Sequence, residues 1–144
     1  MGRLVVEGIA IRFAQREVVV ARLFETFSVV VGGWRPETGS ARLGSVLVGQ
    51  RGAQGWEFVG RVGSGLAGRA GAGLLTRLHP LERADSPFVT QVPREDATGT
   101  TWVDPQVVID VASLGRSSGG RLRQPSYQRL RADLTATDLE GSDG

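Results

Sequence analysis

Gly63, Gly65 and Gly68 have the G-x-G-x-x-G spacing of dinucleotide-binding loops, between a strand-like run and a helix-like run. Glu82 lies near the distance expected of a ribose-binding acid. Such a loop requires a parallel sheet, with another buried strand soon after the helix. Here the helix-like run leads into a proline-bearing loop, 82–100. The sequence therefore predicts a glycine-rich turn, and it argues against a dinucleotide oxidoreductase.

The remaining chemistry-bearing residues form no catalytic constellation. The single histidine, His79, stands at the end of the helix-like run, which indicates a capping role beside the helix dipole. Two pairs of acids lie in loops without supporting ligands and are expected to be solvated: Glu82 with Asp85, and Glu95 with Asp96. We predict neither a catalytic residue nor a metal site.

Arginine is the most informative residue type. All 17 basic residues are arginines, and lysine is absent. Residues 1–133 carry these 17 arginines against 12 acids, a net charge of +5. The stretch 116–131 holds five arginines and no acid. This patch indicates a phosphate-bearing partner, most simply nucleic acid, although scattered solubilising charges would give the same composition.

Composition limits the class of protein. The 144 residues suit one domain, and hydrophobic residues, at 40%, are enough for a packed core. No apolar run is long enough to span a bilayer, and no signal-peptide pattern is present, so we expect no membrane association. The absence of cysteine excludes disulfides and thiolate metal sites and is consistent with a cytoplasmic location.

The predicted elements are short strands, one helix and further strands. Strands are expected in 4–12, 17–31, 44–50, 56–63 and 101–113, and a helix over 66–78. The sequence RGAQG predicts a hairpin between the third and fourth of these segments. Without a repeating βαβ pattern, this order favours a mainly β fold: a small antiparallel Greek-key barrel of the OB type, with one inserted helix and a short C-terminal segment.

Five stretches, in order, resemble the C-terminal OB domain of bacterial ATP-dependent DNA ligases. They are VVVGGWRPETGSARLGSVLVG, FVGRVGSGL, LHPLERADSPF, TWVDPQVVIDV and GRLRQPSYQRLRADL. The resemblance implies an OB domain over 17–133. It also implies that 1–16 is the remnant of the end of a nucleotidyltransferase domain. The polar segment 134–144 is expected to be a disordered acidic tail.

The departures from the family concern its chemistry. These ligases load AMP onto a lysine, and a chain without lysine cannot form that adduct. The resemblance leaves a partial nucleotide-binding set of Glu7, Arg22 and Arg131, whereas Val20 and Leu134 stand where the family has cations. We therefore expect no self-adenylation and no cofactor for this chain alone; ATP and Mg²⁺ are implied for the complete ligases.

The resemblance implies a monomeric DNA-binding module that binds nicked or duplex DNA chiefly by contacting the DNA backbone. Nick sealing in DNA repair or recombination would then need a separate catalytic domain. Two alternatives stay open: the non-catalytic subunit of a split ligase with a separate nucleotidyltransferase chain, and a non-functional remnant of a ligase gene. The expected DNA contacts are six arginines: Arg42, Arg61, Arg116, Arg121, Arg123 and Arg129.

Overall fold

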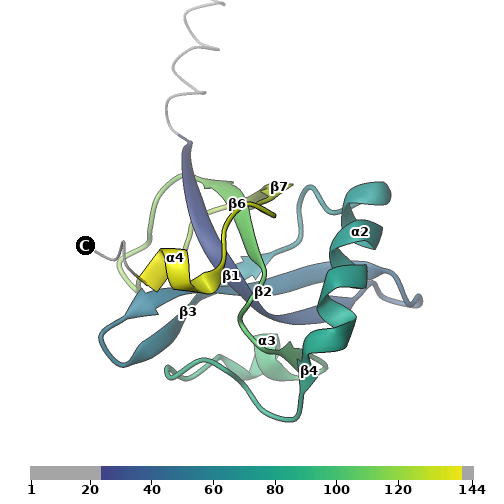
Figure 1. Ribbon diagram of the computed structural model, residues 1–144, viewed down its shortest axis with the longest axis horizontal. Coiled ribbons are helices and arrows are strands. Elements are labelled where there is room, and N and C mark those ends of the chain that lie inside the picture. Colours follow the sequence, from purple (N-terminus) through teal and green to yellow (C-terminus); the bar gives the residue numbers. More distant parts are fainter. Residues whose placement is uncertain (1–23, 141–144) are drawn as a thin grey trace, which may run out of the picture.

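The computed structural model describes residues 24–140 as one mainly β domain (Figure 1). Its strands are β1 (Glu25–Pro36), β2 (Leu43–Gly52), β3 (Gly55–Val62), β4 (Glu82–Arg83), β5 (Thr101–Val103), β6 (Val108–Ser113) and β7 (Ser126–Leu130). Its helices are α2 (Arg69–Leu78), the 3-10 turn His79–Leu81, α3 (Arg94–Ala97) and α4 (Ala136–Glu140). Within the described residues, no helix is long and apolar enough to cross a membrane.

Strand β1 is the centre of the antiparallel sheet. Its C-terminal half pairs with β2 from Val30 to Pro36, and its N-terminal half pairs with β6 from Glu25 to Val30. A short ladder to β5 begins at Gly33. One long strand thus joins both sides of the barrel, which is how a sheet with few strands curls onto itself. The mainly β antiparallel barrel predicted from the sequence is confirmed.

The barrel closes where β3 meets the segment leading into β7. Strands β2 and β3 shift register after Val48, and this bulge frees the carbonyl of Val59 to accept a hydrogen bond from Leu122 N–H (2.7 Å). Further along, Tyr127 N–H donates to the carbonyl of Ser64 (2.8 Å). The seam therefore rests on isolated backbone bonds in place of a continuous ladder.

The sheet is buried on both faces, because successive side chains of a strand point to opposite sides. The inner core is aliphatic and holds Val29 and Val31 of β1 together with Leu74 and Leu78 of α2. The outer core is a second buried cluster on the other face of β1, β2 and β3: Val30, Leu47, Trp56, Phe58, Phe88 and Val108. The inner face of the sheet thus packs inside the barrel and against α2, and later segments of the chain cover its outer face.

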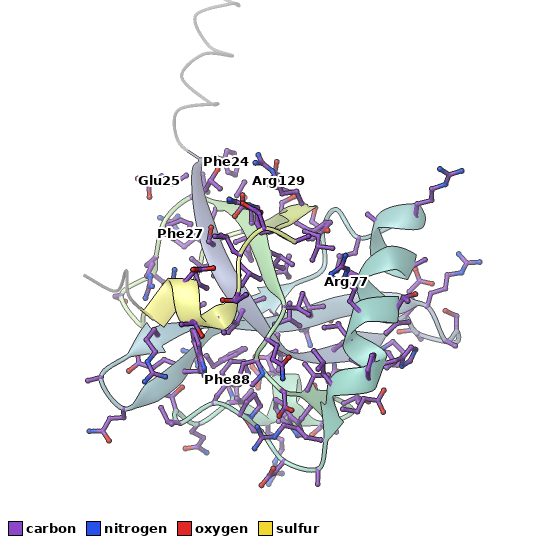
Figure 2. The ribbon with its side chains drawn as sticks, in the orientation of Figure 1. Phe24, Glu25, Phe27, Arg77, Phe88 and Arg129 are labelled. Atoms are coloured by element: carbon purple, nitrogen blue, oxygen red, sulfur yellow. The ribbon has the colours of Figure 1, made fainter. Side chains whose placement is uncertain are left out.

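A segment that we call the strap, residues 84–100, covers part of the outer core. Its anchor is Phe88, which is labelled in Figure 2. The ring of Phe88 lies against two residues without side chains, Gly32 and Gly49. A Cβ atom at either glycine would lie within 2.5 Å of that ring. The ring also makes edge contacts with Phe58 (5.6 Å between centroids) and Trp102 (6.3 Å). The strap is therefore fastened by shape: a large ring fits a notch made by two glycines.

The glycine-rich stretch is a turn between β3 and α2, as the sequence predicts. Gly65 has φ +90°, and a Cβ there would lie 2.6 Å from the carbonyl oxygen of Tyr127, so this position requires glycine. The hairpin at 52–55 and the helix between β3 and β4 are confirmed. Helix α2 ends in a 3-10 turn that leads to a two-residue strand, and no parallel strand follows it.

The prediction of a disordered tail over 134–144 is wrong for its first part. Residues Ala136–Glu140 form α4, and Leu134, Ala136 and Leu139 pack against the outer core. Thr135 N–H donates to a carboxylate oxygen of Asp138 (2.8 Å) at the start of this turn. Figure 1 places α4 on the opposite side of the barrel from α2. The acidic composition of this segment did not indicate that three of its apolar residues would pack on the outer core and order it.

Candidate functional site

The most cationic exposed element is the loop between β6 and β7. Its ends are joined by Leu114 N–H, which donates to the carbonyl of Arg123 (2.9 Å), and the buried Leu122 anchors it to the barrel. Because Leu122 points inward, its neighbours Arg121 and Arg123 point to the surface. Arg116 is exposed on the other arm. Among the side chains described for residues 24–139, no carboxylate lies at ion-pair distance from these three guanidinium groups.

Arg121 is held in place by an aromatic ring. Its guanidinium carbon lies 4.8 Å from the centroid of Phe58, a residue of the outer core. Arg51 makes a similar contact with Trp56 (5.5 Å), and both rings belong to the same face of β3. A guanidinium that lies over an aromatic ring keeps the N–H groups in its own plane free for other acceptors. The loop therefore presents at least one cation of restricted orientation.

Arg61 and Arg42 do not belong to this cluster. Arg61 projects from β3 and forms an ion pair with Asp96 of the strap (3.4 Å). Arg42 lies in the connection between β1 and β2, where it lines a cleft of about 440 Å³ against Gly68 and Leu75 on the α2 side. Figure 1 shows this connection and the β6–β7 loop at opposite sides of the barrel. The six arginines predicted to contact DNA thus do not form one patch.

Arg129 and Arg131, on and just beyond β7, share the buried carboxylate of Asp110, which is 2% exposed. The Nη1 group of Arg131 donates to Asp110 Oδ2 (3.2 Å), and its Nε and Nη2 groups donate to the two oxygens of Asp133 (2.9 and 2.8 Å). These bonds raise the pKa of Arg131 and lower that of Asp133 to about 2. Two carboxylates therefore occupy the guanidinium edges that a nucleotide phosphate would need.

The remaining candidates from the sequence are His79, the acidic residues that could bind a metal ion, and the other members of the expected nucleotide-binding set. His79 Nδ1 lies 3.1 Å from Glu82 Oε2, and its ring packs edge-on against Trp34 (5.9 Å). In the described part of the chain, no group of three His, Cys, Asp or Glu residues is placed to bind a metal ion. Glu7 and Arg22 of the expected nucleotide-binding set lie outside the described residues.

Two residues of this region escape detection in the sequence. Ser28 of β1 donates to Asp110 Oδ1 (2.7 Å), although 82 positions separate the two. Arg35 holds the far end of the strap by donating to the carbonyls of Asp96 (3.1 Å) and Thr98. Asp110 alternates with apolar residues in β6, and a carboxylate inside such a strand was the available signal that arginine partners face it.

Comparison with known proteins gives a consistent result. The model of the "ATP dependent DNA ligase C terminal region" matches residues 39–134. The chain is 41% identical over 120 residues to the "Multifunctional non-homologous end joining protein LigD" of Mycolicibacterium smegmatis, covering 82% of this chain and 16% of that protein. It is 34% identical over 126 residues to a "DNA ligase" of Halobacterium salinarum, covering 81% of this chain and 20% of that protein.

Solved structures agree with these matches. The ligase domain of M. tuberculosis LigD superposes with a TM-score of 0.77 at 42% identity, covering 81% of this chain and 38% of that one. A mycobacterial DNA ligase D complexed with ATP and MES gives 0.72 at 40% identity, covering 81% and 37%. The chain spans about one sixth of the length of the first curated relatives.

Proposed function

The chain belongs to the family of ATP-dependent DNA ligase C-terminal regions, and on this premise we propose that it binds the phosphate backbone of nicked or duplex DNA. The observation that carries the proposal is the β6–β7 loop with its three arginines, none of which has a carboxylate partner among the side chains described for residues 24–139: Arg116, Arg121 and Arg123. Arginine contacts to phosphate give affinity without reading sequence. Oligonucleotide-binding OB folds commonly use the loop between their last two strands.

The other usual OB surface, the outer face of the second and third strands, is largely filled in this chain. Phe88 of the strap and Leu139 of α4 pack on it. Bases therefore have little aromatic surface to stack on, since Trp56 and Phe58 are at least 92% buried. This arrangement favours contact with the sugar–phosphate backbone of a duplex over stacking of single-stranded bases.

Nick sealing is proposed only in combination with a separate nucleotidyltransferase chain. The family is ATP-dependent, but the residues present do not fit ATP and Mg²⁺: the chain has no lysine, and Arg131 is occupied by two carboxylates. Mixing the chain with such a partner should raise the rate of nick sealing, and an unchanged rate would remove the split-ligase interpretation.

Fluorescence anisotropy of a labelled nicked duplex, titrated at several salt concentrations, tests DNA binding. The logarithm of the binding constant should fall linearly with the logarithm of the salt concentration, by about 0.9 per phosphate contacted. Replacing the three loop arginines by glutamine should make this slope shallower by up to about 3. A matched control is Arg69→Gln, which removes an exposed arginine from α2. No binding at low salt, or equal loss in the control, would refute the proposal.

A further inference from the structure

A polar row crosses three strands at the edge of the outer core. Ser28 of β1, Asp110 of β6 and Arg129 of β7 are direct partners in their ladders. Residues directly opposite one another in antiparallel strands project to the same face. The row therefore runs from a hydroxyl, through a carboxylate, to a guanidinium.

The carboxylate at the centre of this row is fully enclosed, whereas the guanidinium is not. Asp110 is 2% exposed, and the side chain of Arg129 is 63% exposed, with Nη1 3.6 Å from Asp110 Oδ2. Ser28 donates to the other oxygen, Oδ1, at 2.7 Å. Figure 2 shows Arg129 at the end of the barrel where β1 begins, on the periphery of the molecule. One edge of this guanidinium faces a fixed anion, and the rest faces solvent.

Stability alone does not explain a buried carboxylate here. Removing a carboxylate from water costs several kcal/mol, and apolar residues of similar volume often serve a core as well or better. A buried carboxylate can instead fix the orientation of the arginine side chains that it binds. Arg131 is also bound to Asp133, so its edges are shared between two acids, whereas Arg129 contacts Asp110 alone among the described residues. Asp110 thus binds two arginines that differ in their surroundings. The guanidinium of Arg131 is also bound by Asp133, whereas the guanidinium of Arg129 is otherwise exposed to solvent.

We propose that Asp110 is a positioning residue that holds Arg129 by its inner edge, so that the outer edge meets a phosphate of the DNA backbone. The inference rests on the proposed DNA binding. It adds Arg129 of β7 as a second contact point, besides the β6–β7 loop. A guanidinium fixed in advance loses less side-chain entropy when it binds phosphate than a freely rotating one. Arg129 should therefore contribute more to binding than an exposed arginine without such support.

Asp110→Asn separates this role from simple charge. Removing a negative charge from a DNA-binding protein should tighten binding or leave it unchanged. A positioning role predicts the opposite: affinity falls about tenfold, as for a lost charged hydrogen bond, and the salt slope becomes shallower by about one. Asp133→Asn is the control, because Asp133 forms its ion pair with Arg131 and interacts with Arg129 only through longer-range charge. That control should not weaken binding.

A double-mutant cycle with Arg129→Gln provides the decisive readout. If Asp110 acts through Arg129, then Asp110→Asn should cause no further loss of affinity once Arg129 is replaced. Ser28→Ala is a milder second variant, which keeps every charge and loosens the carboxylate. It should weaken binding in the same direction, again only while Arg129 is present. It also keeps the test valid if Asp110→Asn fails to fold, which thermal unfolding will show.

The outcomes are distinguishable. Absence of salt-dependent binding by the unmodified chain would refute the proposed function itself. Binding that depends on the loop arginines but is unaffected by Arg129→Gln would refute only the positioning inference. The same conclusion would follow if Asp110→Asn lowered the melting temperature and left the affinity and salt slope of a still folded protein unchanged.

Discussion

The attachment of the strap can be tested by replacing Phe88 with alanine. The ring is 8% exposed, fills the notch above Gly32 and Gly49, and touches two other aromatic rings. Truncation of a buried phenylalanine costs about 3–5 kcal/mol, and the two edge contacts favour the upper half of that range. We expect a loss of about 4 kcal/mol, which is a large fraction of the roughly 5–15 kcal/mol that stabilises a domain.

The assay is thermal and urea unfolding followed by circular dichroism. For a domain of this size, the expected loss corresponds to a fall in melting temperature of about 15 °C. Amide exchange adds a local readout, because Val89 N–H donates to the carbonyl of Trp56 (2.8 Å) and should lose protection before the barrel strands do. Val89→Ala is the control: that side chain is 53% exposed, and its removal should change stability by less than about 0.5 kcal/mol.

A loss below about 1 kcal/mol for Phe88→Ala, with the Val89 amide still protected, would refute this reasoning. It would mean that polar contacts hold the strap, and that packing of the ring into the glycine notch adds little to the free energy of unfolding.

Three further predictions concern the glycine notch, Arg35 and Asp133. Gly49→Ala should destabilise the fold by about 1–3 kcal/mol, because its methyl group would overlap the ring of Phe88, and urea unfolding will measure this. Arg35→Met should cost about 1–2 kcal/mol and increase amide exchange around Thr98, since the carbonyl of Thr98 loses its donor and that of Asp96 keeps only the Thr100 hydroxyl. The pKa of Asp133 is lowered to about 2 from 3.8, so its ion pair stabilises the fold above pH 3.8, and the contribution is lost as the pH falls toward 2. The difference in melting temperature between the unmodified chain and Asp133→Asn should therefore shrink between about pH 4 and pH 2 and disappear only below about pH 2, and a difference that persisted at still lower pH would contradict this account.

Local signals in the sequence were enough for the elements with short-range partners. The RGAQG turn predicts the hairpin because β2 and β3 pair directly across it. Helix α2 is predicted from its apolar face, although it begins at Arg69 because the backbone turns at Gly68 (φ +69°). The strand predicted to end at Val31 continues to Pro36, because Pro36 pairs with Leu43 of β2.

Long-range contacts account for what the sequence did not reveal. The predicted strand over 101–113 divides into β5 and β6, because Gln106 N–H turns back to the carbonyl of Asp104 (2.8 Å). Helix α4 forms because Leu139 reaches an outer core built mainly from residues far earlier in the chain. In the candidate site, the arginine-rich loop was predictable from composition. The pairing of Arg61 with Asp96 was not predictable, because it depends on where the strap lies.

The central place of β1 has a consequence for the order in which the chain is made. This strand is synthesised before its partners in the described part of the chain, and Ser28 meets Asp110 only after 82 further positions. At about 5–20 residues per second, one edge of β1 waits roughly 4–16 s for β6. During that interval its N–H and C=O groups are open to the same strand of a neighbouring nascent chain. The strand that unites the finished barrel is thus the place where unfinished copies would associate, and slower initiation, which spaces ribosomes further apart, should raise the yield of folded protein.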